Sequence, residues 1–226
     1  MSHQEYDIYP LVNSFGDSLN TNVTDLTGSL VEVGLDSIMD DGLLKDIPFL
    51  STAISVYRIG HSVKERFCIK KLAIFIDEIN KNTVKEERRS KYRLDFQENQ
   101  DFRNRELEHI LVLIDRYVTC DNAIFLAKIY LAYLDGIIDW VTFTQYSEIL
   151  DRFLYADITA LKRIGDENYL SPQDQLLRIS ALGLVGTVEK MPDFKDEDGV
   201  LWVTQEEKHY ILTDFGATLK TILFDD

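Results

Sequence analysis

The sequence is poor in the residues and patterns that mark secreted and membrane-spanning proteins. Its 226 residues include only two cysteines and four prolines. Two cysteines are too few for the disulfide framework of a small secreted domain, so we expect a cytoplasmic protein. The first ten residues contain Glu5 and Asp7 and no basic stretch before an apolar one, which predicts no signal peptide. No run approaches the ~18 apolar residues of a membrane-spanning helix.

Catalytic motifs are missing as well. The sequence has no glycine-rich phosphate loop and no dinucleotide fingerprint. Asp214-Phe215-Gly216 spells a kinase triplet, but no other kinase motif precedes it. Cys68 lies between apolar residues and Cys120 lies at a helix junction, positions typical of buried thiols rather than nucleophiles.

Glu106 and His109 form the one pair with metal-ligand spacing. A Glu-x-x-His pair places a carboxylate and an imidazole on one helix face, but a di-iron bundle needs a second such pair and two further glutamates. The second pair is absent. The sequence therefore predicts no catalytic, cofactor-binding or metal-binding residues and no cofactor, and a protein that is not an enzyme.

Charge is distributed unevenly within a net charge of −15. Residues 1–44 contain eight acidic residues and no Lys or Arg, whereas residues 45–105 contain 14 basic and nine acidic residues. Two interpretations stay open for this basic segment: it folds against the acidic remainder or forms a solvated face, or it binds an anionic partner. The candidate patch for an anionic partner clusters around Tyr92 and consists of Arg88, Arg89, Lys91 and Arg93.

Apolar periodicity predicts a mainly α-helical fold. Leu19, Val23, Leu26, Leu30 and Val33 follow one helical face. Residues 47–57 are uncharged, with Pro48 suited to a first helical turn, and the apolar pattern continues past a break near Gly60. Three further helices are expected: one over 103–118 with a stripe ending at Val118, one capped by Asp121 and running to Leu134, and one from Asp139 or Thr142 to Tyr155. Asp135-Gly136 is the expected turn between the last two.

The last 56 residues predict a helix, a strand, a polar excursion, a strand and a helix. Ser171-Pro172 starts the first helix and Leu182-Gly183 ends it. Leu184–Val188 and Tyr210–Leu212 are the strands, residues 190–207 form the excursion, and Thr213 caps the last helix. The segments LLRISALGLVGTVEK and HYILTDFGATLKTIL resemble the winged helix-turn-helix domains of bacterial regulators. This resemblance implies a small α+β module with a β-hairpin.

A second resemblance lies within residues 107–155. The segment FLAKIYLAYLDGIIDWVTFTQYSEIL resembles the helix–Asp-Gly–helix unit of the TerB-like tellurite-resistance proteins. That family places an acidic residue shortly after the turn, whereas this chain has Trp140-Val141-Thr142-Phe143. The resemblance therefore implies helix packing and no metal site.

These observations predict an acidic N-terminal arm or helix (1–44), an α-helical domain (45–165) and a winged-helix-like module (168–226). Our leading hypothesis is a bacterial interaction or regulatory protein that docks a protein partner or self-associates. One alternative is a DNA-associated transcriptional regulator, although the predicted wing carries seven acidic and three basic residues and would repel phosphates. Another is a membrane-active or defence-type effector that makes peripheral membrane contact through residues 47–76.

Overall fold

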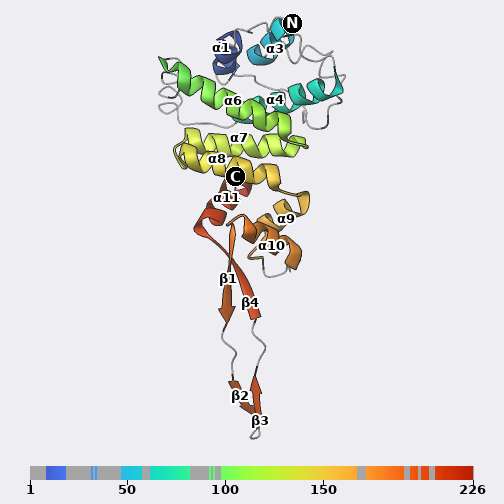
Figure 1. Cartoon of the computed structure of the whole chain (residues 1–226), viewed down its shortest axis with the longest axis vertical. Helices are drawn as coiled ribbons and strands as arrows, with labels where there is room; N and C mark the ends of the chain where they lie inside the picture. The colour runs from blue at the N-terminus through green and yellow to red at the C-terminus, as the bar shows by residue number, and fades with distance from the viewer. Residues whose placement is uncertain are drawn as a thin grey trace, which may run out of the picture. The chain divides into compact units, whose positions relative to one another are not determined.

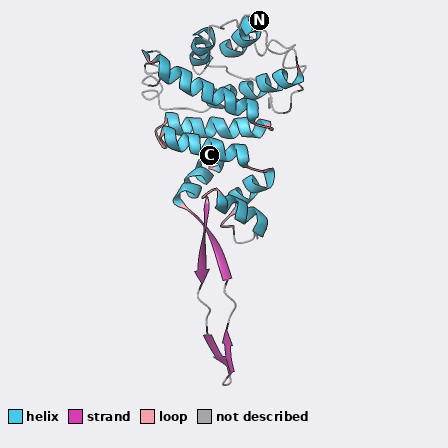
Figure 2. Ribbon diagram, viewed as in Figure 1, coloured by secondary structure: helices cyan, strands magenta, loops and turns pink. Residues whose placement is uncertain are grey.

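The computed structural model describes residues 9–18, 47–57, 62–81, 98–166, 172–190, 194–197, 200–203 and 207–225, together with residues 32, 34, 92 and 94. The described chain is mainly α-helical, with antiparallel strand pairs near the C-terminus (Figures 1 and 2), which confirms the predicted fold class. Its contacts divide it into two compact units, the N-terminal unit Met1–Asp151 and the C-terminal unit Arg152–Asp226.

The N-terminal unit is built from helices alone in its described part. They are α1 (Tyr9–Ser18), α3 (Pro48–Tyr57), α4 (Val63–Lys81), α6 (Gln100–Arg116), α7 (Cys120–Leu134) and α8 (Trp140–Arg152). Helix α1 packs on α3, and α4 packs along α7. The expected turn at Asp135-Gly136 is confirmed, because Gly136 adopts a positive φ of 64° after the end of α7.

A row of aromatic rings forms the centre of this unit. The Phe15 ring of α1 lies 5.4 Å from that of Phe49 and 6.5 Å from that of Phe75, measured between centroids. Phe75 continues to Tyr130 at 5.9 Å, and Tyr130 to Phe143 at 5.5 Å. All five residues are fully buried. The row joins one residue from each of α1, α3, α4, α7 and α8, so a single core holds these helices together.

Most of the apolar residues of 47–76 whose burial the structure describes belong to this core, whereas Val63 is 73% exposed. Ile47, Phe49 and Leu50 are buried, as are Ile69 and the residues from Leu72 to Ile76. Ser18 fixes the start of α3, because its hydroxyl accepts a hydrogen bond of 2.8 Å from the amide of Phe49. Among the described residues, no helix combines the length and the apolar character needed to cross a bilayer.

Part of the positive charge of residues 45–105 is used inside the unit. Lys71 is buried, and its ammonium group donates to the carbonyl oxygens of Tyr117 at 2.6 Å and Asp115 at 3.4 Å, at the C-terminal end of α6. Lys64 pairs with the Asp115 carboxylate at 3.1 Å. These contacts support the interpretation that basic residues fold against the acidic remainder. The five residues predicted to follow one helical face from Leu19 to Val33 lie outside the described residues, and so does Gly60.

Two predicted helix boundaries were wrong. Val118 was expected on the buried stripe of α6 but is 82% exposed, because the helix ends at Arg116 and the chain turns to an extended conformation at Tyr117. Tyr117 takes the buried position instead and donates a hydrogen bond to the carbonyl of Ser147. Thr119, not Asp121, caps α7, since its hydroxyl accepts from the amide of Asn122.

The C-terminal unit combines three helices with four strands. These are α9 (Tyr155–Arg163), α10 (Gln173–Ala181), β1 (Val185–Lys190), β2 (Phe194–Glu197), β3 (Val200–Val203), β4 (Glu207–Leu212) and α11 (Asp214–Phe224). The predicted left-handed cap at Gly183 is confirmed by its φ of 76°. The predicted Thr213 cap is also confirmed, because its hydroxyl accepts from the amide of Gly216 at 2.9 Å. Helix α10 begins after Pro172, one residue later than predicted.

Helix α9 was not predicted as a separate element, and its contacts place it in the C-terminal unit rather than in the helical body. The predicted helix to Tyr155 ends at Arg152. The Asp157 carboxylate then accepts from the amide of Leu154, which starts α9, and pairs with Arg178 of α10 at 2.8 Å. This ion pair, between the buried Asp157 and the partly exposed Arg178, fastens α9 to α10.

The polar excursion predicted over residues 190–207 contains two strands instead. Strand β1 pairs with β4, as predicted, and β2 pairs with β3. Both ladders share one antiparallel register. In the first ladder Lys190 pairs with Glu207. In the second, Phe194, four residues after Lys190, pairs with Val203, four residues before Glu207. We refer to strands β1 to β4 as the hairpin arm. The missed signal was Asp198-Gly199, the two residues between Glu197 and Val200, since Asp-Gly favours two-residue hairpin turns.

Candidate functional site: a groove on α6 and α8 above a buried carboxylate

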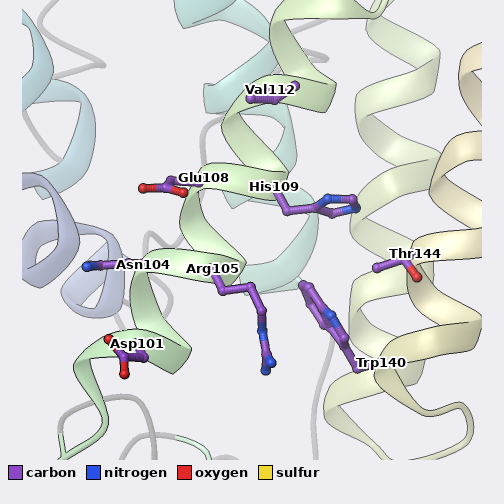
Figure 3. Close-up of a pocket in the computed structure, with 8 residues that line it drawn as sticks. All are labelled: Asp101, Asn104, Arg105, Glu108, His109, Val112, Trp140 and Thr144. Carbon is purple, nitrogen blue, oxygen red and sulfur yellow. The ribbon is translucent and has the colours of Figure 1, made fainter.

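A groove of about 510 Å³ lies between α6 and α8 in the N-terminal unit. Figure 3 shows Arg105 and His109 of α6 and Trp140 and Thr144 of α8 in the space between the two helices. Asn104 and Glu108 lie on the other side of α6 in the same view. The remaining lining residues are Asp101 and Val112. The volume falls within the range of small-molecule sites, although the groove is open to solvent.

The side chain of Arg105 spans two aromatic faces. Its guanidinium carbon lies 5.3 Å from the centroid of Trp140 and 5.6 Å from that of Phe102, distances at which a cation is attracted to an aromatic ring. Arg105 itself is exposed. Within the described part of the chain it forms no ion pair. The groove therefore presents one fixed cation whose hydrogen-bonding edge is accessible.

His109 is held in a defined orientation next to this cation. Its ring lies 5.6 Å from Trp140 and 5.9 Å from Phe143, and its Nε2 is 3.3 Å from the hydroxyl of Ser147. Burial lowers the pKa of His109 below its ordinary value of 6.5, so the imidazole is neutral at pH 7. Ser147 is fully buried and its hydroxyl donates to the carbonyl of Thr144 at 2.9 Å. This Ser–His pair thus offers no accessible nucleophile.

The carboxylate of Glu106 lies on the interior side of α6 and is surrounded by tyrosine hydroxyls. Tyr92 donates to it at 2.6 Å and Tyr133 at 2.7 Å. The Tyr130 hydroxyl lies 3.1 Å from the carboxylate and also contacts the Tyr92 hydroxyl, so its single proton serves one of these two contacts at a time. Glu106 is completely buried. Burial raises the pKa values of Tyr92 and Tyr130 well above 10, so both stay protonated and donate. We call these four residues the Glu106–tyrosine cluster; sequence analysis did not predict it, because its members lie far apart in the chain.

The position of Tyr92 changes the interpretation of the basic run around it. The phenol is engaged by Glu106, and its ring makes edge contacts with Phe102 at 5.9 Å and Tyr130 at 6.2 Å. A ring held in this way is not presented for stacking on a nucleic-acid base. The predicted patch residues Arg88, Arg89, Lys91 and Arg93 lie outside the described residues, so the patch stays a prediction.

The other sequence candidates are not brought together. Glu106 contacts tyrosines and His109 contacts Ser147, so the Glu-x-x-His spacing does not form a joint site. Burial raises the pKa values of the Cys68 and Cys120 thiols, which opposes formation of the reactive thiolate at neutral pH. Among the described residues, no group of three His, Cys, Asp or Glu side chains is arranged to hold a metal ion.

The titration of Glu106 should make stability depend on pH. Burial raises the pKa of Glu106 above its ordinary 4.5, and the tyrosine hydrogen bonds only partly offset this shift. The native state therefore binds the proton more tightly than the unfolded chain. The stabilising contribution of this group is present below pH 4.5 and is lost as the pH rises through the raised folded-state pKa.

We therefore expect the free energy of unfolding of the wild type, minus that of Glu106→Gln, to fall as the pH rises from 4.5 towards neutrality. Urea titrations of both proteins across this range measure the difference, and glutamine keeps the side-chain shape without the titration. A difference that stays constant or increases with pH would contradict the raised pKa.

Comparison of the chain with family models, with curated proteins and with solved structures finds no match. The resemblances to winged helix-turn-helix domains and to TerB-like proteins therefore stay predictions. The resemblance to winged helix-turn-helix domains predicts the order helix, strand, strand, helix, and α10, β1, β4 and α11 follow one another in that order.

Proposed function

We propose that this chain is a non-enzymatic interaction protein of bacterial, cytosolic type that docks a protein partner through its hairpin arm. The single observation that carries the proposal is the arm itself: two antiparallel ladders in one register, with no third strand paired to either edge among the described residues. A two-stranded hairpin is at best marginally stable alone in water, and unpaired strand edges are templates for adding another strand. Such an arm is stabilised when a partner covers it.

Exposed apolar side chains add to this argument. Val185 at the base of β1 is buried, but Val188 is 46% exposed and Ile211 of β4 is 53% exposed. Val188 pairs with His209, two residues from Ile211, so Val188 and Ile211 are diagonal neighbours on one face of the ladder. This apolar pair is suited to contact with a partner.

Charge supports a protein partner rather than DNA. Residues 189–208 carry seven acidic and three basic residues, and phosphate contacts require an excess of Lys and Arg. The same charge disfavours pairing between the arms of two copies. We therefore favour a heterologous partner with a basic or neutral surface, and a DNA-associated regulator would have to bind DNA through a surface other than the arm.

The register of the arm allows a precise test. Replacing residues 191–206 with Asn-Gly joins the register partners Lys190 and Glu207 through a two-residue turn, which retains the ladder of β1 and β4. In affinity capture from cells of the source organism, we expect partners bound by the full chain to be reduced about tenfold or more with the shortened arm. Sedimentation velocity of both proteins shows whether the partner is a second copy.

A matched control separates the arm from its charge. Shortening the arm removes five acidic residues and one lysine, a change of +4. Neutralising Asp25, Glu32, Asp36 and Asp40 as Asn or Gln gives the same change outside the arm. Equal capture by the full chain and the shortened chain, with both monomeric, would contradict the proposal.

A further inference from the structure

The groove between α6 and α8 has an ordered sequence of chemical groups along its length. Arg105, His109 and Val112 follow the spacing i, i+4, i+7 and therefore lie along one side of α6. Trp140 and Thr144 follow the spacing i, i+4 on α8. Seven residues of helix span about 10 Å. The groove thus offers a cation at one end and, about 10 Å further, the 55% exposed side chain of Val112.

Arg105 differs from three other arginines of the described chain, because no acidic side chain forms an ion pair with it. Acidic residues outnumber basic ones by 39 to 24, and Arg116, Arg163 and Arg178 each pair with an aspartate. Asp101 lies one helical turn from Arg105, yet no ion pair joins them in the described structure. The guanidinium is held by aromatic faces instead, which leaves its planar edge for a carboxylate.

The neighbouring groups favour an apolar body and a single negative charge. His109 is neutral, and its ring, together with Trp140 and Val112, offers apolar surface. The hydroxyl of Thr144 is already engaged, since it donates to the carbonyl of Val141 at 2.7 Å. Asp101 and Glu108 line the same groove and repel any anion, so the single cation of Arg105 can offset this repulsion for one carboxylate but not for two.

From these contacts we propose that the groove binds a small free monocarboxylic acid with an apolar body up to about 10 Å long. The carboxylate forms paired hydrogen bonds with the Arg105 guanidinium, and the apolar body lies along His109 and Val112. Because these residues belong to α6 and α8, this binding site is independent of the hairpin arm and of the function proposed for it.

Tryptophan fluorescence tests the proposal, since the chain contains only Trp140 and Trp202. In a Trp202→Phe background, 3-phenylpropanoate is expected to give a saturable change in the emission of Trp140. The neutral 3-phenylpropanamide, which has the same body, is expected to bind about tenfold or more weakly, because it lacks the charge-assisted hydrogen bonds.

Arg105 variants identify the binding group. Arg105→Gln should reduce the affinity for 3-phenylpropanoate to that for the amide. Arg105→Lys should give an intermediate affinity, since lysine keeps the charge but lacks the paired N–H donors of the guanidinium group. Arg152→Gln removes an exposed arginine outside the groove and is the control. An unchanged thermal unfolding midpoint verifies that each variant is folded. Absence of saturation, equal affinity for acid and amide, or full binding by Arg105→Gln would overturn the proposal.

Discussion

Glu106→Ala is expected to lower the free energy of unfolding of the N-terminal unit by about 3 kcal/mol. The substitution removes a carboxylate that lies within hydrogen-bond distance of three tyrosine hydroxyls, at a position with no solvent exposure. It also leaves a cavity among Tyr92, Tyr130 and Tyr133, because alanine fills only part of the volume. Denaturant titrations monitored by circular dichroism at pH 7 measure the effect.

Tyr133→Phe is the matched control for the Glu106–tyrosine cluster. It removes one hydroxyl donor, 2.7 Å from Glu106, and leaves the carboxylate with two others. We expect a loss of about 1 kcal/mol. If Glu106→Ala cost no more than Tyr133→Phe, the carboxylate would not be the centre of the cluster.

Gly216→Ala is expected to destabilise the C-terminal unit by about 3 kcal/mol, through overpacking. A Cβ atom at Gly216 would lie 1.9 Å from the carbonyl oxygen of Leu184 and 2.7 Å from its carbonyl carbon. Backbone atoms cannot rotate away as a flexible side chain can. The first turn of α11 would have to move from Leu184, which also accepts a hydrogen bond from the amide of Thr213. Thermal and chemical unfolding of the variant measure the loss.

Gly183→Ala gives the contrast within the same unit. Gly183 has a φ of 76°, and a Cβ atom there would meet no atom within 4 Å. The cost is then limited to the left-handed backbone conformation, about 1 kcal/mol. A larger loss for Gly183→Ala than for Gly216→Ala would show that the contact with Leu184 does not determine the packing of α11.

Sequence patterns predicted those elements whose signals are local. Gly183 marks the end of α10, Thr213 caps α11, and Asp135-Gly136 separates α7 from α8, because each of these signals acts within a few residues. Helix α9 was missed because its first turn depends on Asp157, whose carboxylate also pairs with Arg178, 21 residues further along the chain. Such a contact leaves no periodic signal in the sequence.

The candidate site was less predictable for the same reason. His109 was selected for its spacing from Glu106, but the two side chains have separate partners. His109 contacts Ser147 on α8, whereas Glu106 contacts tyrosines, two of which belong to α7. Arg105 stands out only once Trp140 and Phe102 are seen beside it. Gly216 is a further example. In the sequence it completes an apparent kinase triplet, whereas in the structure its close approach to Leu184 explains why a glycine stands there.

Site-specific photo-crosslinking tests the proposed docking function most directly. A benzophenone amino acid at Ile211, which is 53% exposed on the hairpin arm, is compared with the same group at Val63, which is 73% exposed at the start of α4. After irradiation in cells of the source organism, we expect a discrete crosslinked protein from position 211 and none from position 63. Crosslinking from position 63 alone, or from neither position, would contradict docking through the hairpin arm.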